Sequence, residues 1–244
     1  MSLPASLEFA YFKRTLLFQF EAGTSRGVLH TRDVYWIKVQ GKGNLGHVGW
    51  GEAAPLAGLS PDFGPDFENQ LSAVLLQARN RFWDLEEEAT LKQVKELVPF
   101  SLPSIRFGLE TALLDLVHGG IKRILPNAFF DQGTPIPING LIWMGTKEFM
   151  LQQISQKLSA GFSCLKMKIG AIDFEQELEL LHYIRQKKSA SELTLRVDAN
   201  GAFSTAEVLS KLEQLRECQL HSIEQPIRAG QWKAMRELAL QSPV

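Results

Sequence analysis

The sequence contains few cysteines. Only 2 of its 244 residues are cysteine, at positions 164 and 218. They do not form a CxxC pair and no second cluster accompanies them, so the sequence encodes neither a disulfide framework nor a zinc site. A chain of this kind suits a reducing compartment, and we expect a cytoplasmic protein.

The sequence also has no excess of either charge. Lys and Arg total 26, Asp and Glu total 27, and the formal net charge is -1. Without an excess of positive charge there is no global field to attract nucleic acid or an anionic membrane, and we expect neither partner. No stretch approaches the roughly 20 apolar residues of a membrane span. Lys13 and Arg14 interrupt the apolar start of the chain, which predicts a strand rather than a signal peptide.

Strands and helices alternate without a regular spacing in the first half. Alternating residues rich in Val, Ile, Tyr, Trp and Phe predict strands, and apolar residues at helical spacing predict helices. The predicted strands are Phe9–Phe20, Asp33–Gln40 and His47–Ala53, and the predicted helices are Phe67–Trp83, Thr90–Leu97 and Ser104–Val117. We take Ser104 as the N-cap of the last helix and the Gly119-Gly120 pair as its end.

One string in this half matches a nucleotide-binding motif. Residues 41–46, Gly-Lys-Gly-Asn-Leu-Gly, fit the pattern GxGxxG. That pattern binds a pyrophosphate only where a strand leads into a helix. The residues that follow predict another strand, so we interpret the string as a hairpin loop.

The second half is periodic. Short apolar strands alternate with amphipathic helices, which implies crossover connections and a parallel sheet, as in a doubly wound fold or a TIM-type barrel. The predicted strands are Ile136–Leu141, Cys164–Ile169, Leu193–Asp198 and Leu220–Glu224, and the predicted helices are Lys147–Ala160, Phe174–Lys187, Thr205–Glu217 and Trp232–Leu240. The fold class is therefore α/β in this part of the chain.

Charged residues stand at the ends of three successive strands, where buried parallel strands are normally apolar. Lys166 and Lys168 share one face of the second strand, and Asp198 and Asn200 share one face of the third. Glu224 ends the fourth. A single such residue is more often a turn residue facing solvent, but three strands with the same pattern favour a ligand site at this edge.

These residue types suit one kind of chemistry. Two carboxylates with no nearby His or Cys select a hard cation, Mg²⁺ before Zn²⁺. Neighbouring positive charges disfavour the ammonium form of a lysine, which can then act as a general base. A base together with a metal can remove a proton α to a carboxylate, because the metal offsets the negative charge that develops.

The same motifs resemble the enolase superfamily, in the muconate-lactonising subgroup. Its barrel carries Lys-x-Lys, Asp-x-Asn and Glu on successive strands, matched here by 166–168, 198–200 and Glu224. More narrowly, residues 49–60 and 103–115 resemble the o-succinylbenzoate synthase family. The resemblance implies an α+β capping domain over residues 1–130 and a (β/α) barrel catalytic domain from residue 131 to 244.

Such a barrel has eight strands, whereas this sequence predicts four. We therefore expect a chain cut off after about half of the barrel. The family's third metal carboxylate and its opposing lysine would lie beyond residue 244. An open sheet edge is a poor end state, which favours a longer protein.

The resemblance implies a carbon–oxygen lyase of menaquinone biosynthesis that dehydrates 2-succinyl-6-hydroxy-2,4-cyclohexadiene-1-carboxylate. Lys168 would be the base and Lys166 its electrostatic partner, while Asp198 and Glu224 would bind Mg²⁺, or Mn²⁺ in its place. Asn200 is a candidate substrate-binding residue. The loop at residues 50–60 would close over the substrate.

Two alternatives stay open. The same half-site suits a racemase or epimerase of N-acylamino acids or dipeptides, in which two lysines on opposite faces exchange the proton. The chain could also be a catalytically dead binding or assembly protein that kept the scaffold. The sequence does not predict an oligomeric state.

Overall fold

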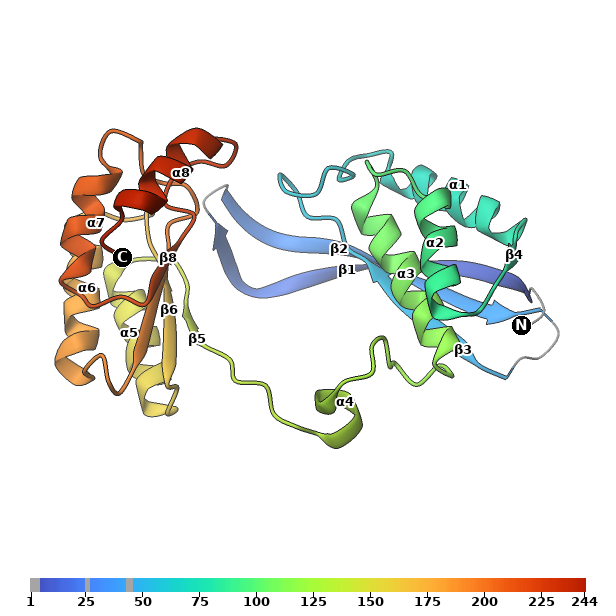
Figure 1. Cartoon of the computed structure of the whole chain (residues 1–244), viewed down its shortest axis with the longest axis horizontal. Coiled ribbons are helices and arrows are strands. Elements are labelled where there is room, and N and C mark those ends of the chain that lie inside the picture. Colours follow the sequence, from blue (N-terminus) through green and yellow to red (C-terminus); the bar gives the residue numbers. More distant parts are fainter. Residues whose placement is uncertain (1–4, 25–26, 43–45) are drawn as a thin grey trace. The chain divides into compact units, whose positions relative to one another are not determined.

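The computed structural model describes residues 5–24, 27–42 and 46–244 (Figure 1). The chain divides into two compact units. The first consists of Met1–Glu21 and Leu29–Pro135, and the second of Ala22–Val28 and Ile136–Val244. The predicted domain boundary at residue 130 stays a prediction.

The first unit combines an antiparallel sheet with helices. Its strands follow the order β3-β2-β1-β4, and β1 pairs antiparallel with β4 as β2 does with β3. The elements in chain order are β1 (Ala5–Thr24), β2 (Gly27–Gly41), β3 (Val48–Ala53), α1 (Phe67–Arg79), β4 (Phe82–Trp83), α2 (Glu87–Leu97), α3 (Pro103–Val117) and α4 (Ala128–Gln132).

The core of the first unit lies between the sheet and helices α1 to α3. Alternate residues of β2, such as Ile37 and Val39, are fully buried there with Leu109 of α3. Strand β3 approaches α3 so closely that a Cβ on Gly51 would lie 2.0 Å from the carbonyl oxygen of Gly108. Only glycine fits this contact between two backbones.

The second unit contains a parallel four-stranded sheet in the order β5-β6-β7-β8. Its elements are β5 (Gly140–Ile142), α5 (Lys147–Ser159), β6 (Cys164–Lys168), α6 (Phe174–Lys187), β7 (Thr194–Asp198), α7 (Val208–Arg216), β8 (Ser222–Glu224) and α8 (Trp232–Gln241). Each strand is followed by a helix. The predicted fold class, an α+β domain followed by the first half of a (β/α) barrel, is confirmed.

The two faces of this parallel sheet differ in character. Leu165, Met167, Leu195 and Val197 are buried in a core shared with the helices, and α5, α6 and α7 lie on that side of the sheet (Figure 1). Since side chains alternate along a strand, Lys166 and its neighbours at even positions project from the other face. The sheet therefore presents polar groups on one side only.

The structure corrects the start of the first parallel strand. The prediction placed it at residues 136–141, but β5 begins at Gly140. Pro135 and Pro137 each lack the backbone N–H that a sheet ladder requires. The isoleucines at 136 and 138 are exposed, so their apolar alternation is not evidence of burial.

Among the predicted helix boundaries that differ from the structure, those of α3 and α1 differ because of tertiary contacts. Ser104 is not an N-cap, because α3 begins at Pro103 and the Ser104 amide and hydroxyl both donate to the carboxylate of Asp62. Helix α1 ends at Arg79 rather than at Trp83, since Phe82 and Trp83 pair with β1 instead. Both differences come from tertiary partners that local patterns do not encode.

The GxGxxG string connects two antiparallel strands. Strand β2 ends at Gly41, and Gln40 pairs with Val48 of β3. Residues 43–45 lie outside the described residues. No helix follows the string, so the condition for pyrophosphate binding is not met.

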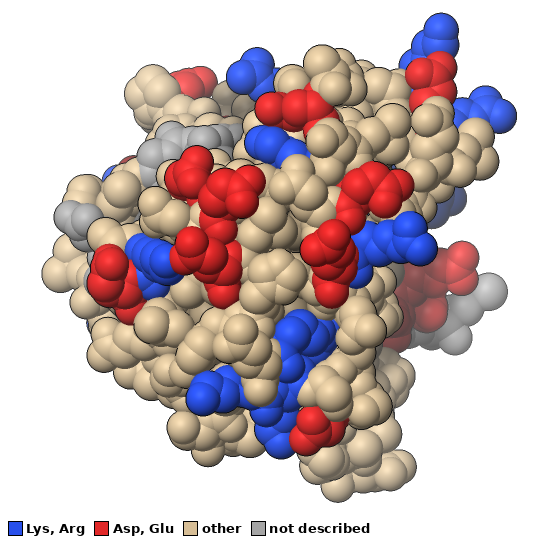
Figure 2. All heavy atoms as spheres, turned by 90° about the vertical axis from the view of Figure 1, so that its left-hand side faces the viewer, with Lys and Arg blue, Asp and Glu red and all other residues tan. Residues whose placement is uncertain are grey.

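The surface of the second unit carries both signs of charge. Acidic and basic side chains occur together on the face in Figure 2, as the near-zero net charge leads one to expect. In the described part of the chain, no helix has the length and apolarity needed to cross a membrane.

The two cysteine thiols should differ in reactivity. Cys218 is 0% exposed, and burial raises the pKa of its thiol to about 11, whereas Cys164 is partly exposed. Because the thiolate is the nucleophile, we expect a maleimide at pH 8 to label Cys164 well before Cys218. Peptide mapping by mass spectrometry over time would measure both rates. Equal labelling of the folded protein would contradict the burial of Cys218.

Candidate active site

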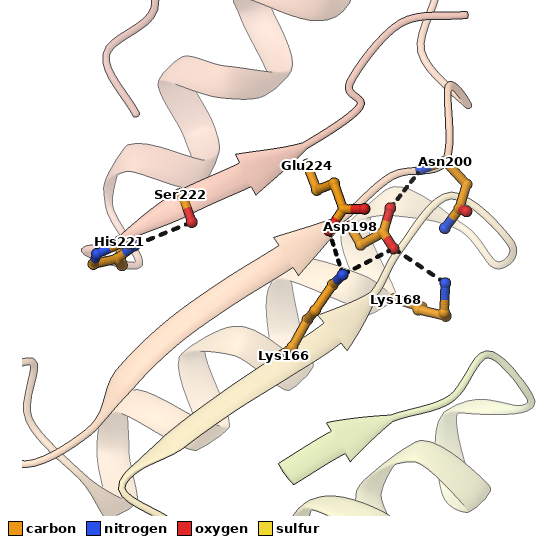
Figure 3. Close-up of polar contacts among 7 residues, drawn as sticks. All are labelled: Lys166, Lys168, Asp198, Asn200, His221, Ser222 and Glu224. Atoms are coloured by element: carbon orange, nitrogen blue, oxygen red, sulfur yellow. Dashed lines mark hydrogen bonds and ion pairs between the residues drawn. The ribbon is translucent and has the colours of Figure 1, made fainter. Parts of the chain in front are cut away.

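Four charged side chains from three neighbouring strands meet at the carboxyl ends of the second sheet (Figure 3). The parallel register places Lys168 beside Asp198, and Asp198 beside Glu224. Lys166 lies two positions before Lys168 and projects from the same face of β6. The structure thus brings together four of the five residues predicted from the sequence to form a site, and Asn200 follows in the loop after β7.

Ion pairs connect these four side chains. The Nζ atom of Lys168 lies 3.1 Å from Oδ2 of Asp198, and Nζ of Lys166 lies 3.3 Å from the same oxygen. Lys166 also forms an ion pair with Glu224. The Asp198 side chain is 5% exposed, whereas that of Glu224 is 63% exposed. The buried carboxylate of Asp198 therefore has two lysine partners, and Lys166 bridges the carboxylates of Asp198 and Glu224.

These contacts change the acidity of two groups. Burial alone would raise the pKa of Asp198, but the hydrogen bonds from Lys168 and the Asn200 amide, together with both lysine charges, hold it below its usual value. Burial would likewise lower the pKa of Lys166, and its contacts with Glu224 and Asp198 raise it instead. Asp198 is thus held as a carboxylate and Lys166 as an ammonium.

A tight turn after β7 positions Asn200. The residue has a positive φ of 47°, and its backbone N–H donates to Oδ1 of Asp198 at 3.0 Å. The next residue, Gly201, donates its N–H to the carbonyl of Gln225 in the loop after β8. The side-chain nitrogen of Asn200 is buried and has no hydrogen-bond partner among the described residues. A donor in this state is available for a ligand.

In the first unit, the two stretches used for the family resemblance are joined by one carboxylate. Asp115 is buried in α3 and accepts the backbone N–H of Trp50 at 2.9 Å. It also accepts the N–H of Lys122. Asp115 therefore links strand β3 to the segment after α3, and these hydrogen bonds explain why a carboxylate is buried in this helix.

Comparison with known proteins identifies the family. Residues 150–244 match the model for the enolase C-terminal domain-like family. The chain is 40% identical to an o-succinylbenzoate synthase from Desulfotalea psychrophila, over 98% of this chain and 70% of that protein. The chain belongs to the enolase superfamily. The crystal structure of MenC from the same organism superimposes with a TM-score of 0.81 at 33% identity, covering 98% of this chain and 70% of that one.

More distant solved structures share the fold. An o-succinylbenzoate synthase from Thermosynechococcus elongatus, solved with Mg in the active site, has a TM-score of 0.70 at 24% identity, over 96% of this chain and 66% of that one. The L-Ala-D/L-Glu epimerase from Bacillus subtilis, solved with its substrate, has a TM-score of 0.75 at 19% identity, over 98% and 66%. The chain thus spans about two thirds of these relatives.

The donor set of this enolase-superfamily chain fits part of a magnesium site. Asp198 and Glu224 supply only oxygen ligands, which Mg²⁺ prefers. The Lys166 ammonium bridges both carboxylates, so the two can face one cation. Within residues 5–24, 27–42 and 46–244, no three His, Cys, Asp or Glu residues form a metal cluster. That Asp198 and Glu224 bind a metal ion therefore stays a prediction.

Sequence reasoning missed Glu177, which supports the loop after Lys168. This carboxylate on α6 is 1% exposed and accepts the backbone N–H groups of Gly170 at 2.6 Å and Ala171 at 3.3 Å. Burial raises the pKa of Glu177 in spite of these bonds. An acidic residue in the first turn of a helix is normally explained by its favourable interaction with the helix dipole. The sequence pattern therefore did not indicate that Glu177 binds the loop after β6.

Two histidines of the second unit lie apart from the site. His221 precedes β8, at the end of that strand opposite Glu224 (Figure 3). Its ring contacts the hydroxyl of Ser222. His182 lies on α6, where its ring is 3.9 Å from the sulfur of Cys218. Neither joins the lysine and carboxylate group.

Proposed function

We propose that the protein containing this chain is an o-succinylbenzoate synthase. It would dehydrate 2-succinyl-6-hydroxy-2,4-cyclohexadiene-1-carboxylate to 2-succinylbenzoate in menaquinone biosynthesis. The observation that supports this chemistry is the position of the Lys168 Nζ atom, 3.1 Å from the buried carboxylate of Asp198 at the carboxyl edge of a parallel sheet. The 40% identity to the Desulfotalea enzyme supports the choice of substrate.

Lys168 performs the proton transfers in this mechanism. Its neutral amine takes the proton from the carbon that bears the carboxylate, and the C–H electron pair moves towards that carboxylate. As the ring becomes aromatic, the C–O bond to the hydroxyl breaks, and the ammonium of Lys168 returns the proton so that water leaves. One base on one face of the ring is sufficient for both steps.

The surrounding residues orient the substrate. Lys166 places a second positive charge beside the substrate carboxylate, and the free amide nitrogen of Asn200 can donate a hydrogen bond to it. Asp198 and Glu224 would hold Mg²⁺, with Mn²⁺ as a possible substitute. When bound, the metal supplies positive charge that offsets the negative charge developing on the carboxylate. The two cysteines without a disulfide support a cytoplasmic location.

A substrate panel tests this proposal. Full-length protein with Mg²⁺ would be assayed with the cyclohexadiene carboxylate, an N-acylamino acid and a dipeptide. We expect ultraviolet absorbance to report formation of the aromatic product from the first substrate only. Racemisation needs a second acid on the opposite face, so proton exchange and inversion of the other substrates, without aromatisation, would favour the epimerase alternative. No turnover of any substrate would favour a binding protein.

A further inference from the structure

An aromatic residue extends the row of charged groups along the sheet edge. Ile142, the last residue of β5, pairs with Met167 of β6, and both are fully buried. The following residues, Trp143 and Lys168, therefore lie next to each other on the opposite, polar face. Across the ends of β5, β6, β7 and β8 the order is Trp143, Lys168, Asp198 and Glu224.

The Trp143 ring is in contact range of the expected base. The Lys168 Nζ atom lies 5.8 Å from the centroid of the indole ring, within the range of a cation–π interaction. The same Nζ atom pairs with Asp198 on its other side. The reacting nitrogen is thus bracketed by an aromatic face and a carboxylate.

A side chain from α5 holds the Trp143 backbone in place. Oε1 of Gln153 accepts the Trp143 N–H at 3.0 Å, and Nε2 of Gln153 donates to the Trp143 carbonyl at 3.2 Å. Trp143 follows the last residue of its strand, where the regular ladder no longer fixes the backbone. The paired hydrogen bonds replace the ladder there, so the position of the indole is supported from the helix behind it.

We propose that Trp143 forms the wall against which the ring of the substrate lies, next to Lys168. The inference rests on the proposed function and names a substrate-positioning residue for it. The carbon that loses its proton is a member of the substrate ring and bears the carboxylate, so the rest of the ring lies on the other side of that carbon. With the carboxylate directed to the Mg²⁺ that Asp198 and Glu224 would hold, and the reacting carbon at Lys168, the rest of the ring extends towards β5, where Trp143 lies.

This arrangement selects a class of substrate. A planar or nearly planar unsaturated ring that carries a carboxylate can stack against indole. An N-acylamino acid or a dipeptide has a flexible open chain at this place instead of an unsaturated ring, and gains less from a flat aromatic wall. Trp143 therefore favours a cyclic carboxylate over the substrates of the epimerases.

Two substitutions of Trp143 distinguish stacking on an aromatic ring from contact with any large apolar side chain. Trp143→Phe keeps an aromatic wall, and Trp143→Leu removes it. Trp232→Phe is the matched control, since that tryptophan is 80% exposed at the start of α8. Gln153→Ala removes both backbone hydrogen bonds while leaving the indole in the sequence. All variants would be made in the full-length protein with saturating Mg²⁺.

Two measurements are made on each variant: steady-state kinetics, and tryptophan emission during titration with the stable product 2-succinylbenzoate. We expect Trp143→Leu to raise KM, and the Kd of the product, by roughly tenfold or more, Gln153→Ala to raise both by less, and Trp143→Phe to stay within about threefold. The change in emission on product binding should persist in Trp232→Phe and disappear in Trp143→Phe. If Trp143→Leu fails to fold, the proposal is tested by Trp143→Phe, which keeps an aromatic side chain: its change in tryptophan emission on product binding shows whether Trp143 contacts the ligand.

The proposal is overturned if Trp143→Leu leaves KM and Kd within twofold of the parent, or if Trp143→Phe keeps the full emission change. Failure of the proposed function looks different: the parent protein then makes no aromatic product. Product binding with a Trp143-dependent emission change would in that case still support the aromatic wall. A parent protein that does not bind 2-succinylbenzoate would overturn both.

Discussion

Replacing Lys168 by Ala should lower kcat by on the order of 10²–10⁴-fold or more while leaving the fold intact. The Nζ atom of Lys168 lies 3.1 Å from Oδ2 of Asp198 and 5.8 Å from the centroid of the Trp143 ring. Its side chain projects from the polar face of β6, so its removal leaves the packed face with Leu165 and Met167 unchanged. Turnover of the cyclohexadiene substrate, with circular dichroism as the check on folding, would measure the effect.

A positive charge at position 168 should not be sufficient for activity. Lys168→Arg keeps a positive charge but should also be inactive, because a guanidinium stays protonated and cannot accept the substrate proton. Lys188→Ala is the matched control, since that lysine is exposed and pairs only with Glu192 among the ion pairs of the described residues. Turnover of Lys168→Ala within a few-fold of the parent would mean that the base lies elsewhere.

The second half of the fold was predictable because its local and tertiary signals agree. Helix α6 has the predicted boundaries, Phe174–Lys187, since its apolar face packs on the sheet and basic residues occupy its last turn. Strand β6 begins at the predicted Cys164. Strand β4 was not predicted, because two residues at the end of a helical pattern carry too little periodicity to indicate a strand.

The site was partly predictable for a related reason. Lysines and acids at strand ends contradict the apolar pattern of buried parallel strands, so Lys166, Lys168, Asp198 and Glu224 stand out in the sequence. Which of them form pairs depends on the register between strands, and the sequence of one strand does not contain it. Trp143 stayed unnoticed because a tryptophan after an apolar strand is typical of a core.

Asp198→Asn should have the other large effect, a loss of Mg²⁺ affinity together with a fall in turnover of on the order of 10²-fold or more. The amide keeps the shape of the side chain and an oxygen, but it removes the charge that faces Lys166 and Lys168. Titration calorimetry with Mg²⁺ would measure the affinity. Glu213→Gln on α7 is the control, because that carboxylate is exposed and pairs with Arg216.

The same variant carries a pH signature in the metal-free protein. The pKa of Asp198 is lower in the folded protein than its usual value of 3.8, so its ion pairs add stability above that value. This stability disappears as the pH falls through the folded-state pKa. The parent should therefore melt at a higher temperature than Asp198→Asn near neutral pH, and the gap should close in acid. If Asp198→Asn binds Mg²⁺ as tightly as the parent, Asp198 is not a metal ligand. If the difference in melting temperature between the two proteins does not change with pH, the ion pairs of Asp198 do not stabilise the fold.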